Sequence, residues 1–157
     1  MKIIFEKISD KEHKLSIIRR DGSSESILCE SRSYLNHDLT HFALETEAGL
    51  SNGFWGRVAD GQQLTSNDDG IDLLQPQQQK IRQIEAVVGV LHNLSQEPES
   101  GAILQNLHMQ GDGLGWQIPQ WLNEDLIDRV RERLRRLKGH WQATAYGRSM
   151  TLTWEIN

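Results

Sequence analysis

Two histidines, His37 and His41, stand four residues apart in a segment with a helical pattern. On an α-helix this spacing places both side chains on one face, about one turn apart. Two imidazoles in that arrangement can bind a single divalent metal ion. The sequence therefore predicts a metal-binding or acid/base site on a helix that begins at His37.

Two carboxylates in the same segment are candidates for acid/base catalysis. The order His37-Asp38-Leu39-Thr40-His41 is similar to the H-E-x-x-H helix of zinc metalloproteases, with Asp38 in the position of the general-base glutamate. Aspartate is one methylene shorter than glutamate, which argues against a peptidase. Glu45 continues the same stripe, but eight residues separate it from His37, or about 12 Å along a helix axis. We therefore expect Glu45 to lie near the site without binding the same ion.

A third metal ligand must come from another segment, and the sequence leaves three candidates open: Glu85, His92 and His108. Imidazole and carboxylate ligands together favour zinc, nickel or manganese over calcium. The alternative interpretation is that the stripe of His37, His41 and Glu45, called here the histidine stripe, is a solvated polar face. It would then lie opposite a core face that carries Leu39, Phe42, Ala43 and Thr46.

An alternative function, as a non-enzymatic protein-interaction domain, is suggested by two other regions. Residues 129–138 hold six basic residues and one acidic residue, in a chain whose formal net charge is -5. Acidic residues precede the arginines on this helix, an order that complements the helix dipole. The negative net charge disfavours nucleic-acid binding. Residues 95–121 contain prolines and several glycines and are expected to be mostly loop, with a length that is unusual in a compact domain.

A third feature is the segment Gly53-Phe54-Trp55-Gly56, in which a tryptophan stands between two glycines. Glycine has no Cβ, so another part of the backbone can approach closely there. We expect a short helix in this region, between Ser51 and Gly61.

Strand patterns at both ends of the chain enclose helical patterns in the middle. Three short strands are expected within the first 30 residues, with a turn at Asp21-Gly22. A C-terminal hairpin is expected from the alternation of apolar and polar residues over 141–156. Further helices are expected over 77–94 and after Asn123. The predicted fold class is α+β, an antiparallel sheet of about five strands packed against about four helices.

Length and composition predict one domain spanning residues 1–157. A single cysteine, Cys29, excludes an intramolecular disulfide and a multi-cysteine zinc site. No apolar run is long enough to cross a bilayer, so we expect a cytoplasmic protein. The apolar residues of the 81–94 segment are also compatible with the seam of a homodimer.

Two stretches of the chain resemble a group of small uncharacterised bacterial proteins. Residues 35–56 resemble their pattern L-P-H-D-L-x-H-F/Y-x-V-E followed by G-F-W-G, with Asn36 in place of the usual proline. Residues 122–154 resemble an arginine-rich helix, R-V-R-x-R-L-R-x-L, and a closing G-x-S/T-L-x-L-T-W. No activity is assigned to that group, so the resemblance implies no reaction. It favours a functional role for the residues that match the group's pattern, namely His37, Asp38, His41 and Glu45.

Overall fold

Four strands form an antiparallel sheet in a computed structural model that describes residues 1–65, 76–92, 99–114 and 117–156. The strands are β1 (Lys2–Lys7), β2 (Glu12–Ile18), β3 (Ser24–Glu30) and β4 (Ser149–Thr153). Their order in the sheet is β3-β2-β1-β4, and Phe5 on β1 lies opposite Leu15 on β2 and Met150 on β4. The predicted α+β class and the three N-terminal strands are confirmed, with Gly22 at a φ of 86° in the turn between β2 and β3.

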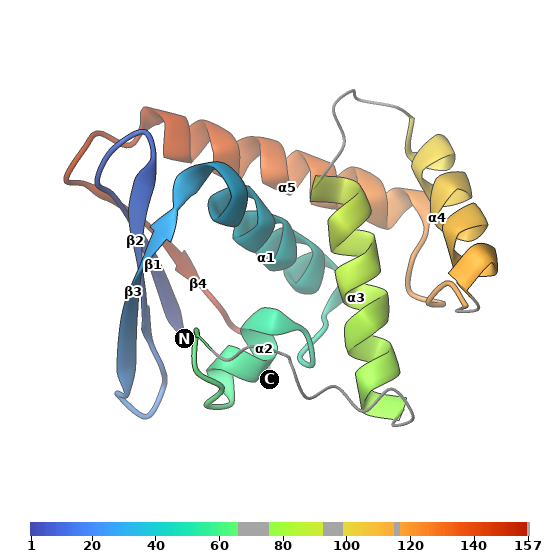
Figure 1. The fold of residues 1–157 in the computed structure, drawn as a ribbon, viewed down its shortest axis with the longest axis horizontal. Coiled ribbons are helices and arrows are strands. Elements are labelled where there is room, and N and C mark those ends of the chain that lie inside the picture. The colour runs from blue at the N-terminus through green and yellow to red at the C-terminus, as the bar shows by residue number, and fades with distance from the viewer. Residues whose placement is uncertain (66–75, 93–98, 115–116, 157) are drawn as a thin grey trace.

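One face of the sheet is covered by helices (Figure 1). The helical segments are the π-helical turn η1 (Ser31–Leu35), α1 (Asn36–Ala48), α2 (Phe54–Ala59), α3 (Pro76–His92), α4 (Ser100–Leu114) and α5 (Glu124–Ala143). Helix α1 packs against α2, α3 and α5, and it separates the sheet from α3 (Figure 1). None of the helices among these described residues is long and apolar enough to cross a membrane.

The core lies between the sheet and α1. Alternate residues of the strands, such as Ile3, Phe5 and Leu15, are fully buried, as the period of two in a half-buried strand requires. Helix α1 is buried along its whole middle, because every residue from Asp38 to Glu45 is inaccessible or nearly so. The interpretation of the histidine stripe as a solvated face is therefore wrong for His41 and Glu45, which are fully buried, whereas the His37 side chain is 42% exposed.

The predicted C-terminal hairpin is wrong. Residues 141–143 continue α5, and β4 pairs with β1 instead of with a strand that starts at residue 141, so the described sheet has four strands where five were expected. The period-two alternation of Trp141 and Ala143 misled the prediction. Trp141 also continues the helical stripe of Leu134 and Leu137 at a four-residue step, and packing of that stripe decided the outcome.

The prediction of a loop over 95–121 is also wrong for the described part of that segment. Residues 100–114 form α4, and Ile103 and Leu107, one helical turn apart, are buried against the core. Gly101 lies close to α5, because a Cβ at that position would come within 3.2 Å of the Glu124 side chain. Residues 95–98 and 115–116 lie outside the described residues, as does the polar segment 66–75.

Helix α1 starts one residue earlier than expected. The helix begins at Asn36 instead of His37, and the preceding turn η1 is capped by Glu30, whose carboxylate accepts hydrogen bonds from the backbone N–H groups of Arg32 and Ser33. The Asn36 amide instead donates to Nδ1 and to the backbone carbonyl of His92, at 3.1 and 3.3 Å. Helix α1 is followed by Gly49, whose left-handed φ of 66° is typical of a helix C-terminus.

Candidate metal centre

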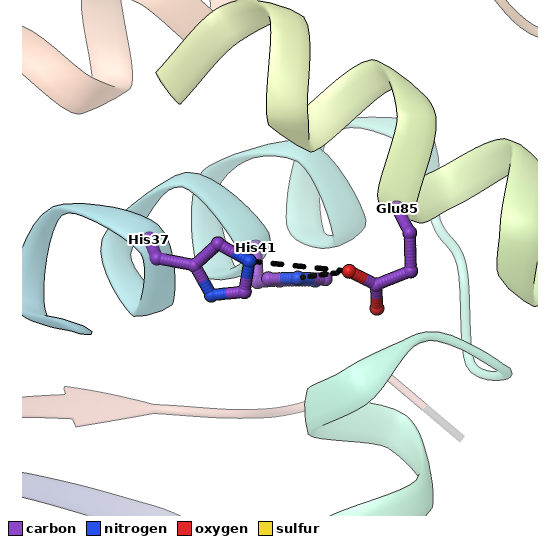
Figure 2. Close-up of side chains that lie close together, drawn as sticks. All are labelled: His37, His41 and Glu85. Carbon is purple, nitrogen blue, oxygen red and sulfur yellow. Dashed lines mark hydrogen bonds and ion pairs between the residues drawn. The ribbon is translucent and has the colours of Figure 1, made fainter. Parts of the chain in front are cut away.

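Three side chains from two helices meet at one point of the structure. His37 and His41 come from successive turns of α1, and Glu85 comes from α3 (Figure 2). One ligand atom from each of the three residues lies within 4.8 Å of the other two. Of the three candidates left open by the sequence, the structure therefore brings Glu85 to the histidine pair.

Both histidines offer the same ring nitrogen to the same carboxylate oxygen. His41 Nε2 lies 3.2 Å from Glu85 Oε2, and His37 Nε2 lies 3.9 Å from it (Figure 2). The two rings are 4.6 Å apart between centroids and meet edge to face. Spacing of this kind follows from the four-residue separation on α1, so the geometric basis of the sequence hypothesis is present in the fold.

A second carboxylate holds His41 from behind. His41 Nδ1 lies 2.9 Å from Glu45 Oε1, and both side chains are almost completely buried. The imidazole ring of His41 therefore lies between Glu45 and Glu85 and contacts each through a different nitrogen. Glu45 lies next to His41 and is not one of the three residues whose ligand atoms converge.

The start of α2 supplies the remaining partners of Glu45. The backbone N–H groups of Phe54, Trp55 and Gly56 donate to its two carboxylate oxygens, at 2.8, 3.0 and 3.4 Å. A carboxylate at the N-terminus of a helix meets unpaired N–H groups, which satisfies a charge that would otherwise be buried without partners. Burial raises the pKa of the Glu45 carboxyl, and the N–H groups that its two oxygens accept oppose that rise.

Two glycines make this close approach possible. A Cβ at Gly53 would overlap the Glu45 carboxylate, and a Cβ at Gly56 would overlap the backbone carbonyl of Ser51. The expectation that the glycines around Trp55 allow another segment to approach is confirmed. The Glu45 side chain, from the end of α1, approaches Gly53. The backbone of Ser51 approaches Gly56.

A buried arginine fixes α2 to the sheet. Arg19, at the end of β2, donates from Nε to the carbonyl of Val58 at 2.7 Å and from Nη2 to the carbonyl of Gln62 at 2.8 Å. The same guanidinium pairs with Glu25 on β3, whose other oxygen accepts the backbone N–H of Leu64 at 3.0 Å. These contacts hold the N–H groups of α2 in place beneath Glu45.

The surroundings of His41 favour its protonated form in the absence of metal. Burial alone would lower the pKa of His41, but the hydrogen bonds with Glu45 and Glu85 outweigh it and raise this pKa to about 9. A neutral imidazole carries one N–H and could donate to only one of its two carboxylate neighbours, whereas imidazolium donates to both. Partial burial opposes ionisation of Glu85, yet His41 lowers the pKa of Glu85 below its ordinary value.

Asp38 lies on the other side of His37. Its carboxylate is 3.8 Å from His37 Nδ1 and is not among the three groups that converge. Each histidine thus has a carboxylate near Nδ1 and the shared Glu85 oxygen near Nε2, although the contact with Asp38 is longer than a hydrogen bond. The structure places Asp38 as a neighbour of His37 rather than as a ligand.

The other two candidate ligands lie elsewhere. His92, at the end of α3, has its ring centroid 5.8 Å from that of His37, and its Nδ1 accepts a hydrogen bond from Asn36. His108 is an exposed residue of α4. Among the described residues, the cluster with metal-ligand spacing is therefore the set His37, His41 and Glu85, named here the HHE cluster.

The donor set of the HHE cluster suits a divalent transition metal. Two imidazoles and one carboxylate form the ligand set of many catalytic zinc sites, in which the fourth position is open to water or substrate. Ligand atoms around a tetrahedral ion at 2.0–2.2 Å lie roughly 3.3 Å apart. The contact between His41 and Glu85, at 3.2 Å, is close to this length, whereas His37 Nε2 lies 3.9 Å from the same oxygen.

The basic helix does not present all of its charge to a partner. Arg129 and Arg133 of α5 pair with Glu47 on α1, at 3.3 and 2.6 Å, and Arg135 pairs with Glu132 on the same helix. Most of the α3 residues that were expected to form a homodimer seam are buried within the chain. These are Ile84, Val88 and Leu91.

Two parts of this site were not predicted from the sequence. Glu85 could not be chosen over the histidine candidates, because it lies 44 residues from His41 in the chain. The backbone donors of α2 were not recognised as partners of Glu45, although the two glycines flanking Phe54 and Trp55 were a usable signal of close approach.

The fold and the site together define an α+β protein with a partly buried histidine–carboxylate cluster. Comparisons of the chain with protein-family models, with curated proteins and with solved structures each found no significant match. The resemblance of residues 35–56 and 122–154 to small bacterial proteins therefore stays a prediction, and the function must be argued from the geometry.

Proposed function

We propose that the HHE cluster binds one divalent transition metal ion, with zinc, nickel and manganese as the candidates. The observation that carries this proposal is the convergence of His37 Nε2, His41 Nε2 and Glu85 Oε2 from two helices. Three protein ligands leave at least one coordination position for an exogenous molecule, so the centre is of the type used in Lewis-acid or hydrolytic catalysis.

The buried pair of His41 and Glu45 adds support. Histidines that bind metals almost always donate their second ring N–H to a carboxylate, a carbonyl or water, which fixes the tautomer and the ring orientation. Glu45 takes this role for Nδ1 of His41 and leaves Nε2 to face Glu85. A histidine that only filled space in the core would need no second carboxylate.

Asp38 and Glu45 enter the proposal with different roles. Glu45 is a positioning residue, because it contacts His41 and the N–H groups of α2 rather than the open side of the cluster. Asp38 remains the candidate for acid/base chemistry beside His37. A cytoplasmic location is part of the same proposal.

The alternative of a protein-interaction domain has less support. Arg129 and Arg133 are engaged with Glu47 inside the chain, and the segment expected to be a long loop contains α4. We therefore rank it below the metal centre.

The decisive experiment measures metal directly. Untagged protein is purified without chelators for elemental analysis, then stripped and titrated calorimetrically with zinc, nickel and manganese. We expect one ion per chain, and at least about tenfold weaker binding in His37→Ala and Glu85→Gln. These two side chains are 42% and 38% exposed, so their replacement leaves the core intact.

Matched controls are available in the same chain. His92→Ala and His108→Ala each remove an imidazole outside the HHE cluster and should keep the affinity of the parent. The proposal is overturned by a stripped protein whose melting temperature and titration heats ignore all three metals. Equal affinity in Glu85→Gln and the parent would overturn the assignment of the third ligand.

A further inference from the structure

A cavity of about 450 Å³ opens between β2, β3, α1 and α2. Its volume lies within the range of small-molecule sites, about 300–1,000 Å³. His37 and Asp38 form part of its wall, and Phe54, whose ring centroid is 5.6 Å from that of His41, forms another part. The cavity therefore lies directly beside the HHE cluster.

The walls of the cavity are mainly apolar. Leu15, Ile27 and Leu64 line it, together with the aromatic ring of Phe54. Two further lining residues are large, apolar and exposed: Leu28 is 64% exposed and Tyr34 is 59% exposed. A group of exposed apolar side chains around a cavity is typical of a binding site.

The charges on the wall are negative. Asp38 and Glu30 contribute carboxylates, and no lysine or arginine is among the described lining residues. The Glu30 carboxylate is already satisfied, because it accepts the backbone N–H groups of Arg32 and Ser33. An anionic molecule would meet two like charges here and no lysine or arginine.

The carboxylate of Asp38 lacks a close partner. Asp38 is only 7% exposed, yet no described residue donates a hydrogen bond to its side chain, and Nδ1 of His37 lies 3.8 Å from its carboxylate. The Asp38 oxygens are not among the fully buried side-chain atoms without a partner, so they are accessible from the cavity. A molecule in the cavity that carries an N–H or O–H group could donate to this carboxylate.

From these observations we propose that the cavity binds a small, mainly apolar molecule that is uncharged or positively charged and donates a hydrogen bond to Asp38. Its apolar part contacts Ile27, Phe54 and Leu64, and its polar end lies beside His37. This inference goes beyond the proposed metal centre and does not require a metal, so each can fail without the other.

The test uses three probes that share one ring system and differ in charge: 2-naphthylmethylamine, 2-naphthylmethanol and 2-naphthoate. Binding to the chelator-stripped protein at pH 7.5 is measured by calorimetry and saturation-transfer NMR. We expect the amine and the alcohol to bind and the carboxylate to bind at least about tenfold more weakly. Asp38→Asn should weaken binding of the amine more than binding of the alcohol, because it removes the carboxylate charge.

Cys29, the only cysteine of the chain, lines the cavity. The rate at which its thiol is alkylated therefore reports whether a probe is bound in the cavity. The alcohol should slow alkylation of this thiol in the parent protein. Cys29→Phe should narrow the cavity and weaken binding, whereas Ile18→Phe, on the exposed face of the same sheet, should leave it unchanged. Failure of all probes to bind, equal binding of the carboxylate, or alkylation unaffected by the alcohol would each overturn the proposal.

Discussion

Nε2 of His41 lies 3.2 Å from Oε2 of Glu85, although 44 residues separate them in the chain. The contact joins the buried middle of α1 to α3, and His37 approaches the same oxygen from the next turn of α1. Because Nδ1 of His41 is held by Glu45, the ring has one orientation, and its second nitrogen can face only Glu85 or a metal ion in the same place.

Glu45→Gln should weaken metal binding without removing a ligand. Glutamine has nearly the same shape but cannot accept hydrogen bonds with both polar ends, so it would place an NH₂ group against N–H donors of α2 or His41. We expect the dissociation constant for the metal to rise about 10–100-fold. Calorimetric titration of the folded variant checks this, with Glu47→Gln on the same helix as the control. An unchanged constant would mean that Glu45 does not position His41.

Metal affinity should increase with pH. The pKa of His41 is about 9 in the metal-free protein, so near neutral pH an incoming ion must displace a proton from this ring. Between pH 7 and pH 8 we expect the dissociation constant to fall about tenfold, with close to one proton released from His41 per ion. Titration in two buffers of different ionisation enthalpy counts the protons. Absence of proton release would contradict the direction given for His41.

Gly53→Ala should destabilise the protein, because the added Cβ would overlap the Glu45 carboxylate. Overpacking of this kind costs about 1–3 kcal/mol of unfolding free energy. The matched control is Gly139→Ala on α5, where a Cβ meets nothing within 4 Å. Removal of a glycine from a helix interior should stabilise that variant by about 0.5–1 kcal/mol. Urea unfolding monitored by circular dichroism distinguishes the two, and the same sign for both would refute the packing argument.

His13 should make the protein less stable in mild acid. Its ring is fully buried, its Nε2 has no hydrogen-bond partner among the described residues, and burial lowers its pKa. Above the unfolded pKa of about 6.5 the ring is neutral in both states; below it the unfolded chain takes up the proton first. The unfolding free energy should therefore fall as the pH drops below about 6.5, by at most about 1.4 kcal/mol per pH unit.

The comparison that isolates His13 is between the parent and His13→Leu, each unfolded in urea at pH 7.5 and pH 5.5. Other groups, including His41, titrate in both proteins and cancel in the difference. The parent should lose more stability than the variant on acidification. Equal losses would show that His13 does not cause the acid sensitivity.

The first three strands could be predicted from the sequence because their signals are local. Ile3, Phe5 and the turn at Gly22 follow the period of two and the glycine preference of a tight turn. The last strand was recognised, but its partner was not, since the register of β4 against β1 joins the two ends of the chain. Trp141 satisfied both a strand pattern and a helix pattern, and only packing against the core could decide between them.

The candidate site shows the same division. The spacing of His37 and His41 is a local property of α1 and was readable. The burial of the stripe was not, because α1 lacks the one-sided apolar pattern by which an amphipathic helix is recognised: polar and apolar residues alike are covered when helices pack on several sides. Selection of Glu85 required the contact between α1 and α3, which no local pattern records.

The HHE cluster joins two points of the chain that are 44 residues apart, so an ion bound there would act as a reversible cross-link. Like any ligand of the folded state alone, it would add an unfolding free energy that rises with the logarithm of free metal, about 2.7 kcal/mol at a hundredfold excess over the dissociation constant. On the proposed function, the folded fraction of the protein, and with it its resistance to proteolysis, would rise and fall with the metal supply of its surroundings.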